Sequence, residues 1–257
     1  MAFQVDVNCD LGESYGSFKV GNDAEIMPCV TSVNIACGFH AGDPLTIAHT
    51  IALAKKHRVA VGAHPGYPDL MGFGRREMQI TYEEAKSYII YQVGALQGFA
   101  KVFGITLQHV KPHGAMYNKA LKNEELAEAI AEAILELNSN LIVFAPPKSV
   151  MAKRATKAGL RVAYEFFADR AYNPDGSLVP RKMAGSVIEK PGEVVERTLK
   201  AITEGVVEAV NGEIVELGTI HTICVHSDTP TAPKIAQALR SGLIKAGIEV
   251  KSVGQFI

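Results

Sequence analysis

Six short polar clusters in this sequence could perform chemistry, and the first follows the opening residues. Apolar residues alternate with Asp6, Asn8 and Asp10 in the stretch VDVNCD, and Glu13 follows shortly after. Side chains of a strand point alternately to its two faces, so these polar ones share a face. Carboxylates near a strand end can hold a cation, position water or receive an amine. We therefore predict Asp10 and Glu13 as catalytic residues and Asn8 as substrate-binding. Asp6, the deepest, has a simpler alternative as a buried carboxylate held in an ion pair or by a hydrogen bond to neighbouring backbone.

The second cluster, NIACGFHAGDP, places an imidazole in a loop between a predicted strand and a predicted helix. His40 is flanked by glycines, which let the backbone approach a ligand closely. Asp43 stands directly before Pro44, where an N-cap residue belongs, so capping is at least part of its role. We predict His40 as a catalytic residue and Asp43 as a substrate-binding residue that also caps the helix.

Two further clusters add imidazoles and cationic groups at predicted strand ends. In GAHPGYPDLMGFGRR, His64 ends a strand, and Arg75 could clamp a carboxylate or phosphate or be a plain surface charge. In QHVKPHGAMYN, Lys111 and His113 flank a proline that stiffens the turn. His109 suits a core position, because a half-buried imidazole needs only one good partner. The predicted catalytic residues here are His64, Lys111 and His113, and Arg75 is predicted to bind substrate.

The last two clusters are EFFADRAY and TICVHSDTP. The first contains Glu165 and Arg170 and precedes a long loop, and long loops in compact domains are often lids or binding loops. The second places His226 and Asp228 on one face of a predicted strand. Ser227 lies between them, but adjacency in sequence cannot make a catalytic triad. The predicted substrate-binding residues of these clusters are Glu165, Arg170, His226 and Asp228.

Composition narrows the classes of function. The chain has 257 residues, of which 47% are hydrophobic and 21% charged, and its formal net charge is -1. This composition gives no electrostatic footprint for nucleic acid, and no apolar run approaches the roughly 20 residues that span a membrane. No secretory leader pattern opens the chain, so we expect a cytoplasmic protein. The four cysteines lack paired spacing, so we expect reduced, mostly buried thiols, although Cys37 near His40 could be a nucleophile or metal ligand.

The elements that must position these clusters alternate between strands and helices. Apolar strand candidates recur at residues 3–9, 31–36, 58–63, 107–111, 140–145, 160–166 and 220–225, with one added edge strand near 249–253. Helical patterns lie between them, which is typical of βαβ units. Thr81 and Glu84 form a capping-box pattern at one helix start. Polar segments follow nearly every strand, which favours a closed barrel over an open doubly wound sheet. We predict one α/β domain over residues 1–257, a seven-stranded β/α (TIM-like) barrel.

The clusters together resemble a known family. The segments DVNCDLGES, NIACGFHAGDP, GAHPGYPDLMGFGRR, HVKPHGAMYN, EFFADRAY and ICVHSDTP resemble, in order and along essentially the whole chain, the LamB/YcsF lactam-utilization family, the A subunit of prokaryotic 5-oxoprolinase. The resemblance implies a barrel of the glycoside hydrolase and deacetylase type. It also implies ATP-dependent opening of 5-oxo-L-proline to L-glutamate, with ADP and phosphate formed and with partner subunits B and C. The family usually has His-Gly-Asp where this chain has Ser227 in the middle, and its side chain would narrow that turn.

The chain lacks a nucleotide-binding motif of its own. Neither GxxxxGK[ST] nor GxGxxG occurs, so we expect ATP to be bound by or with the partner subunits. ATP could activate the lactam by phosphorylating its amide oxygen. In this hypothesis a carboxylate of the first cluster positions or deprotonates water, and one of the three catalytic histidines moves protons. Lys111, with Arg75 or Arg170, binds the substrate carboxylate or the phosphoryl charge.

Two other hypotheses stay open from the sequence. Acids accompanied by several histidines could hold a divalent cation, which would make the chain a metal-dependent deacetylase or amidohydrolase. The sequence does not identify the ligands of such a cation. Alternatively, the chain is a non-catalytic subunit that only presents the lactam to its partners.

Overall fold

Seven parallel strands form the centre of the molecule, and each coincides with a predicted strand. The structure is a computed structural model that describes residues 3–227 and 229–257. In barrel order the strands are β1 (Gln4–Leu11), β2 (Ser32–Ala36), β3 (Ala60–His64), β4 (His109–Val110), β5 (Ile142–Ala145), β6 (Arg161–Phe167) and β9 (Thr222–Val225). Because β9 pairs with both β6 and β1, the sheet closes on itself. The predicted seven-stranded β/α barrel is therefore confirmed.

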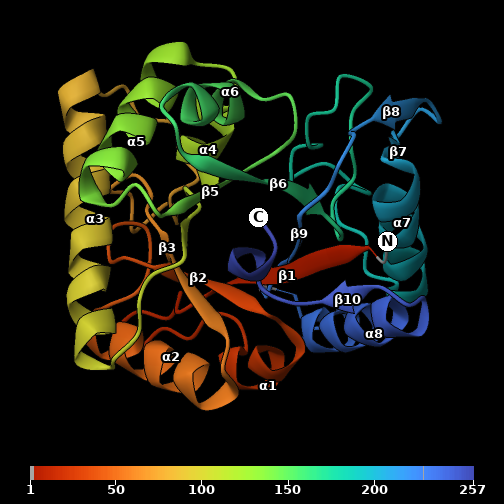
Figure 1. The fold of residues 1–257 in the computed structure, drawn as a ribbon, viewed down its shortest axis with the longest axis horizontal. Helices are drawn as coiled ribbons and strands as arrows, with labels where there is room; N and C mark the ends of the chain where they lie inside the picture. The colour runs from red at the N-terminus through yellow and green to blue at the C-terminus, as the bar shows by residue number, and fades with distance from the viewer. Residues whose placement is uncertain (1–2, 228) are drawn as a thin grey trace.

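Helices surround this barrel and connect its strands (Figure 1). They are α1 (Asp23–Ile26), α2 (Pro44–His57), α3 (Tyr82–Val102), α4 (Gly114–Ala120), α5 (Glu124–Leu137), α6 (Val150–Lys157), α7 (Pro191–Glu204) and α8 (Ala232–Lys245), with 3-10 helices η1 (Met27–Cys29) and η2 (Val253–Gln255). Both predicted helix starts are confirmed. Asp43 caps α2 by accepting from the backbone N–H groups of Leu45 and Thr46, and Thr81 forms a capping box with Glu84 at the start of α3.

Strand β1 shows what the alternating residues at the start of the chain do. Its apolar side chains are fully buried in the core that also contains the inner faces of the helices. Asp6 and Asn8 are equally buried but lie on the opposite face of the strand, inside the barrel. Asp6 accepts hydrogen bonds from the hydroxyls of Thr31, Ser32 and Thr222. Burial raises the pKa of Asp6 to about 6, although these hydroxyls oppose the shift. Asp6 is thus a buried, hydrogen-bonded carboxylate, but its partners are side-chain hydroxyls and not the cation or backbone group expected from the sequence.

The last residues of the chain close the barrel at the amino ends of its strands. β10 (Glu249–Val250) pairs in parallel with the start of β1, which confirms the predicted edge strand. In η2, Val253 packs in a small apolar cluster with Ile142 and Phe144 of β5. Figure 1 shows the C-terminus within the ring of strands. The chain itself thus fills the barrel at the amino ends of the strands.

One element was missed by the sequence analysis. β7 (Val206–Glu208) and β8 (Ile214–Glu216) form an antiparallel hairpin outside the barrel. Its turn contains Asn211 and Gly212, and Gly212 has a φ of 85°, a conformation that glycine adopts without steric cost. An Asn-Gly pair flanked by apolar residues is a strong hairpin signal, so this element was predictable.

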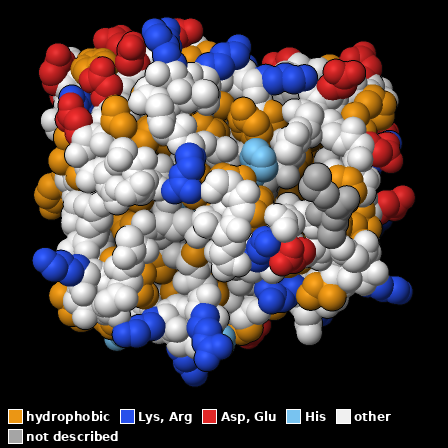
Figure 2. Space-filling model, in the orientation of Figure 1, with side chains coloured by type: hydrophobic (Ala, Val, Ile, Leu, Met, Phe, Trp, Pro, Cys, Tyr) orange, Lys and Arg blue, Asp and Glu red, His pale blue; other side chains and the backbone are white. Residues whose placement is uncertain are grey.

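The surface carries charges of both signs. On the face drawn in Figure 2, Lys and Arg side chains are spread singly, and Asp and Glu side chains lie mainly along the edges. Within residues 3–227 and 229–257, no helix combines the length and the apolar character needed to cross a membrane.

Candidate active site

Most of the predicted site residues lie together at the carboxyl ends of the barrel strands. They are Asp10 near the end of β1, Glu13 in the loop after it, His40 in the loop after β2, His64 at the end of β3, Lys111 and His113 directly after β4, Glu165 in β6 and His226 directly after β9. Each of these residues is at most 8% exposed. This end of a β/α barrel is where barrel enzymes carry their active sites. Two adjoining groups of side chains can be distinguished there.

The first group, here called the lysine group, consists of Lys111, Asp10, Glu165 and Asn8. The Lys111 ammonium lies 2.8 Å from Glu165 Oε1 and 3.1 Å from Asp10 Oδ1, and it donates to Asn8 Oδ1 at 3.3 Å. Tyr117 donates its hydroxyl to the second oxygen of Glu165 at 2.7 Å. Both carboxylates are therefore paired and hydrogen-bonded, which buried charges require.

Within the lysine group, the charges of Asp10 and Lys111 favour each other's ionised form. Burial opposes the charge on Asp10, but His64 and Lys111 hold the pKa of its carboxyl well below the usual range. Burial also opposes the ammonium, while Asp10 and Glu165 raise the pKa of Lys111 well above its usual value. The group thus keeps a buried positive charge at neutral pH, which can stabilise a developing oxyanion.

Beneath the lysine group, polar side chains fill the barrel interior. Asn34 of β2 donates to Asp10 Oδ1 and to Asn8 Oδ1, both at 2.8 Å, and its own oxygen lies 2.7 Å from His109 Nε2. Burial lowers the pKa of His109 to about 3, and the predicted core position of this residue is confirmed. Asn34 was not selected from the sequence, although it lies on the same face of β2 as Ser32 and the alternation rule would have found it.

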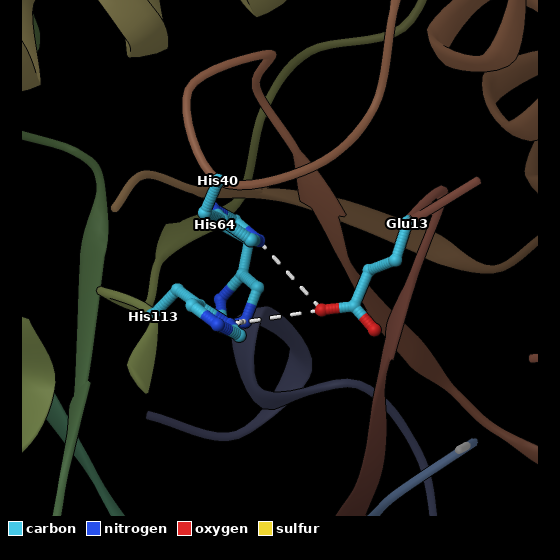
Figure 3. A group of neighbouring side chains, drawn as sticks. All are labelled: Glu13, His40, His64 and His113. Atoms are coloured by element: carbon cyan, nitrogen blue, oxygen red, sulfur yellow. Dashed lines mark hydrogen bonds and ion pairs between the residues drawn. The ribbon is translucent and has the colours of Figure 1, made fainter. Parts of the chain in front are cut away.

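The second group, here called the imidazole group, consists of Glu13, His40, His64 and His113. Figure 3 shows the three rings converging on the Glu13 carboxylate. Glu13 Oε1 lies 3.6 Å from His40 Nε2 and 3.6 Å from His113 Nδ1. His113 Nδ1 in turn lies 2.9 Å from His64 Nε2, and the rings of His40 and His113 stack with centroids 3.7 Å apart.

Backbone carbonyls orient two of these rings. His64 Nδ1 lies 2.7 Å from the Lys111 carbonyl, and His113 Nε2 lies 2.8 Å from the Phe73 carbonyl. A carbonyl only accepts hydrogen bonds, so both ring nitrogens must carry their proton. Phe73 has a φ of 54°, an uncommon conformation for a bulky residue, and it aims this carbonyl at His113. The Gly74 that follows is required sterically, since a Cβ there would lie 2.7 Å from His113 Cδ2.

His40 has no comparable anchor. Neither of its ring nitrogens has a hydrogen-bond partner among the described residues, although the ring is 0% exposed. Burial, together with the charge on a neighbouring imidazole, lowers the pKa of both His40 and His113 well below the usual value. These two rings are therefore neutral at physiological pH and keep a free lone pair.

Asp10 joins the two groups. Its Oδ1 faces Lys111, while its Oδ2 lies 3.4 Å from His64 Nε2. One carboxylate therefore couples the cation of the lysine group to the rings of the imidazole group. This arrangement can hold a water molecule or a substrate amide between an acid, a base and a positive charge.

His226 is held by an acid that the predictions omitted. Its Nδ1 lies 2.8 Å from Asp169 Oδ1, and its backbone N–H donates to the other oxygen at 3.1 Å. Burial opposes the charge on Asp169, but His226 keeps the pKa of that carboxyl below its usual value. Asp169 directly precedes Arg170 in a cluster already selected, so its strand-end position was the signal for it.

Other predicted residues occupy different places. Both oxygens of Asp43 are engaged, by the start of α2 and by the backbone N–H of Gly16. Arg170 donates to the carbonyls of Val179 and Ser186 and so holds the loop after β6, and burial lowers its pKa to about 10. Arg75 is exposed, with its guanidinium 5.6 Å from the Phe73 ring beside the imidazole group. Substrate binding by these three stays a prediction. Asp228 lies outside the described residues.

The cysteines are free thiols, as expected. Burial raises the pKa of Cys37 to about 12, so this side chain is a neutral thiol and does not suit a thiolate role. Cys224 lies 3.1 Å from the Lys111 ammonium inside the barrel, and burial likewise raises its pKa well above the usual value. Packing accounts for both residues.

Known proteins of one family match this chain over nearly its whole length. The model of the LamB/YcsF family matches residues 5–257. A curated relative from Pyrococcus abyssi, named as the A subunit of 5-oxoprolinase, is 55% identical over 254 residues, which cover 99% of each chain. One of the same name from Fusobacterium nucleatum is 51% identical over 257 residues and 100% of each chain.

Two solved structures resemble this chain, one of them closely in sequence as well as in fold. The crystal structure of a lactam utilization protein from Thermus thermophilus superposes with a TM-score of 0.91 at 49% identity, covering 97% of this chain and 99% of that one. A putative cellobiose-phosphate cleavage protein from Enterococcus faecalis shares the fold alone, with a TM-score of 0.56 at 13% identity and 99% of each chain covered. The chain belongs to the LamB/YcsF family.

Proposed function

We propose that this chain is the subunit of an ATP-dependent 5-oxoprolinase in which the lactam ring is opened. Family membership supports the substrate class, since the relatives above are named as the A subunit of 5-oxoprolinase. The observation that carries the catalytic part is the buried Lys111 ammonium between Asp10 and Glu165, next to three imidazoles at the mouth of the barrel. The net reaction consumes two water molecules: one adds across the ring C–N bond and gives L-glutamate, and the other is used as ATP becomes ADP and phosphate.

The geometry suggests a division of roles. Asp10 is a weak base because its pKa is held low, so it positions the attacking water and does not deprotonate it. The imidazole group takes up the proton of that water and delivers one to the ring nitrogen as it leaves. Lys111 stabilises the negative charge at the ring carbonyl oxygen, which is carried by the phosphoryl group if that oxygen is phosphorylated, and this is most effective in a site shielded from water. Arg75, which is exposed and lies over the Phe73 ring beside the imidazole group, would bind the substrate carboxylate.

In this proposal, ATP is bound with the help of partner subunits. The sequence has no P-loop and no dinucleotide-binding motif, so subunits B and C, alone or together with this chain, bind the nucleotide. Activation of the lactam by phosphorylation of its amide oxygen would place negative charge close to Lys111. The relatives are named as one subunit of an enzyme, which supports an assembly of several chains.

The decisive experiment compares this chain, the candidate partner subunits and the complete mixture. We expect 5-oxoproline-dependent glutamate and phosphate in equal amounts from the complete mixture only. A complete mixture that remains fully active when this chain carries Lys111→Ala, Asp10→Ala or His113→Ala would instead make the chain a binding subunit. Hydrolysis of amides or acetyl groups by this chain alone, without ATP, would favour the metal-dependent amidohydrolase, which the imidazole group makes the second candidate.

A further inference from the structure

The imidazole group has the orientation that metal ligands need. His64 and His113 each direct one ring N–H at a backbone carbonyl, of Lys111 and Phe73 respectively. Metal-bound histidines almost always donate their outer N–H in this way, which fixes the tautomer and leaves the inner nitrogen as a lone pair. Here the two inner nitrogens, His64 Nε2 and His113 Nδ1, face each other at 2.9 Å. With both outer nitrogens protonated toward carbonyls, so close an approach of the inner nitrogens needs a positive charge between them, which a shared cation would supply to both rings.

The spacing of the inner atoms fits a tetrahedral ion. Zn²⁺ binds nitrogen and oxygen at about 2.0–2.2 Å, so adjacent ligand atoms of a tetrahedral site lie about 3.3–3.6 Å apart. The contacts measured here are 2.9 Å between His64 and His113, and 3.6 Å from Glu13 Oε1 to both His40 and His113. Candidate ligand atoms of all four residues lie within 4.8 Å of one another. Small rotations of the side chains would complete the coordination.

His40 supplies an independent observation. Its ring is 0% exposed, and neither nitrogen has a hydrogen-bond partner among the described residues. A buried polar atom without a partner is costly, and in a native structure it calls for an explanation such as an ion. Its Nε2 points toward Glu13 in Figure 3, into the space between the rings. A cation bound there would satisfy this nitrogen.

A second cluster of possible metal ligands among the described residues is less suited to a dication. Asp10, Cys224 and His226 also approach one another closely enough to hold an ion. However, the Lys111 ammonium lies 3.1 Å from both Asp10 Oδ1 and Cys224 Sγ, so a positive charge already occupies that side. A dication there would be repelled by the ammonium. The imidazole group is separated from Lys111 by the carboxylate of Asp10.

We propose that Glu13, His40, His64 and His113 bind a transition-metal dication, with Zn²⁺ as the best match. Three imidazoles and one carboxylate suit zinc, iron, copper or nickel, whereas Mg²⁺ and Ca²⁺ prefer oxygen ligands alone. The ion would lie beside Asp10, where it can polarise the carbonyl of the amide or activate a water molecule. With the ion bound, the ring nitrogens that hold it would no longer accept the proton of that water. This catalytic role deepens the proposed lactam hydrolysis and rests on it. Binding of the ion does not depend on the proposed hydrolysis.

The test measures metal binding by the intact chain and needs no turnover. After treatment with a chelator and its removal, Zn²⁺ and Mg²⁺ are titrated separately into the chain by calorimetry. We expect one Zn²⁺ per chain and no comparable Mg²⁺ binding. His40→Gln should weaken Zn²⁺ binding by at least about 100-fold, because loss of a ligand exceeds the 10–100-fold cost of losing a second-layer contact. His109→Gln, which removes a buried imidazole outside the group, should bind Zn²⁺ like the unaltered chain.

Folding is controlled separately. Thermal unfolding identifies a variant that has lost its structure, and Glu13→Gln then replaces His40→Gln as the ligand deletion. The visible spectrum of the unaltered chain with Co²⁺ gives a second measurement, since a four-coordinate site produces intense d–d bands. Absence of stoichiometric Zn²⁺ binding, or unchanged binding in folded His40→Gln and Glu13→Gln, would overturn the site.

The two proposals can fail independently. A chain that binds Zn²⁺ at this group but supports no 5-oxoproline turnover in the complete mixture would remove the proposed function and retain the site. A fully active mixture whose chain binds no Zn²⁺ would remove the site and retain the function.

Discussion

The lysine group and the imidazole group adjoin at the barrel mouth and share one carboxylate, but they contain different kinds of charge. In the lysine group, an ammonium on the chain neutralises Asp10 and Glu165 at contact distances of 3.1 Å and 2.8 Å. In the imidazole group, three rings and Glu13 direct lone pairs toward one another. The cation of the lysine group is a side chain and cannot dissociate, whereas the cation that we propose for the imidazole group would be an exchangeable ion. The difference suggests that Lys111 provides permanent electrostatic stabilisation, while the rings provide chemistry that depends on what they bind.

Removing the fixed cation should have the largest effect. Lys111→Met keeps the length of the side chain but leaves Asp10 and Glu165 buried without their partner, and breaking a buried pair costs about 3–5 kcal/mol. We expect this loss in urea unfolding, and turnover of the complete mixture at least about 100-fold lower because oxyanion stabilisation is removed. Lys86→Met is the matched control, since Lys86 pairs with half-exposed Glu132 and Glu136 and such pairs contribute about 0–1 kcal/mol. Equal losses in both variants would contradict the special position of Lys111.

Removing one imidazole should separate catalysis from stability. His113→Ala deletes a ring that contacts Glu13, His64 and the Phe73 carbonyl, and we expect turnover to fall about 100-fold or more. The free energy of unfolding should change less than in Lys111→Met, because a neutral ring leaves no unpaired buried charge. His49→Ala, at an exposed position of α2, provides the control. If each of the three single variants His113→Ala, Asp10→Ala and Lys111→Ala kept the turnover of the unaltered chain, the site would be refuted.

Arg170 is a buried cation outside both groups, and its contacts hold the loop after β6. Arg170→Met removes the donors to the Val179 and Ser186 carbonyls, each a hydrogen bond from a charged group. We expect limited proteolysis within residues 173–187 to become at least about tenfold faster, because local opening is easier, with a smaller loss of turnover. Arg154→Met, on α6, serves as the control. An unchanged cleavage rate would leave substrate binding as the better role for Arg170.

Asp6, deep in the barrel, should make the stability of the chain depend on pH. Burial raises the pKa of Asp6 to about 6 from 3.8, so the folded state binds the proton more tightly than the unfolded state. The stability that Asp6 contributes through this proton is full below pH 4 and is lost as pH rises through about 6. Two pKa units correspond to about 3 kcal/mol.

Asp6→Asn should remove this dependence. Urea unfolding at pH 4.5 and 7.5 should show a smaller decrease of stability with pH in the variant than in the unaltered chain. The same decrease in both proteins would show that the Asp6 carboxyl titrates at its ordinary pKa in the folded state.

Much of the fold could be predicted because it depends on local signals. Asp43 before Pro44, and Thr81 with Glu84, mark helix starts through contacts within three residues of the chain. The alternation in β1 assigns Asp6, Asn8 and Asp10 to one face without any knowledge of the neighbouring strands. The β7–β8 hairpin was missed although its Asn-Gly turn is equally local.

The sequence alone determined which strand each polar cluster follows, where helices are capped, and which residues lie at the strand ends. Only the tertiary structure decided which of them meet. Lys111 and Asp10 are 101 residues apart, and their contact exists because closure of the barrel through β9 fixes the register of every strand. In the same way, the Phe73 carbonyl orients His113, Asp169 holds His226, and Arg170 anchors a loop. Contacts of this range follow from strand pairing and close packing, and no pattern within a short segment of the chain encodes them.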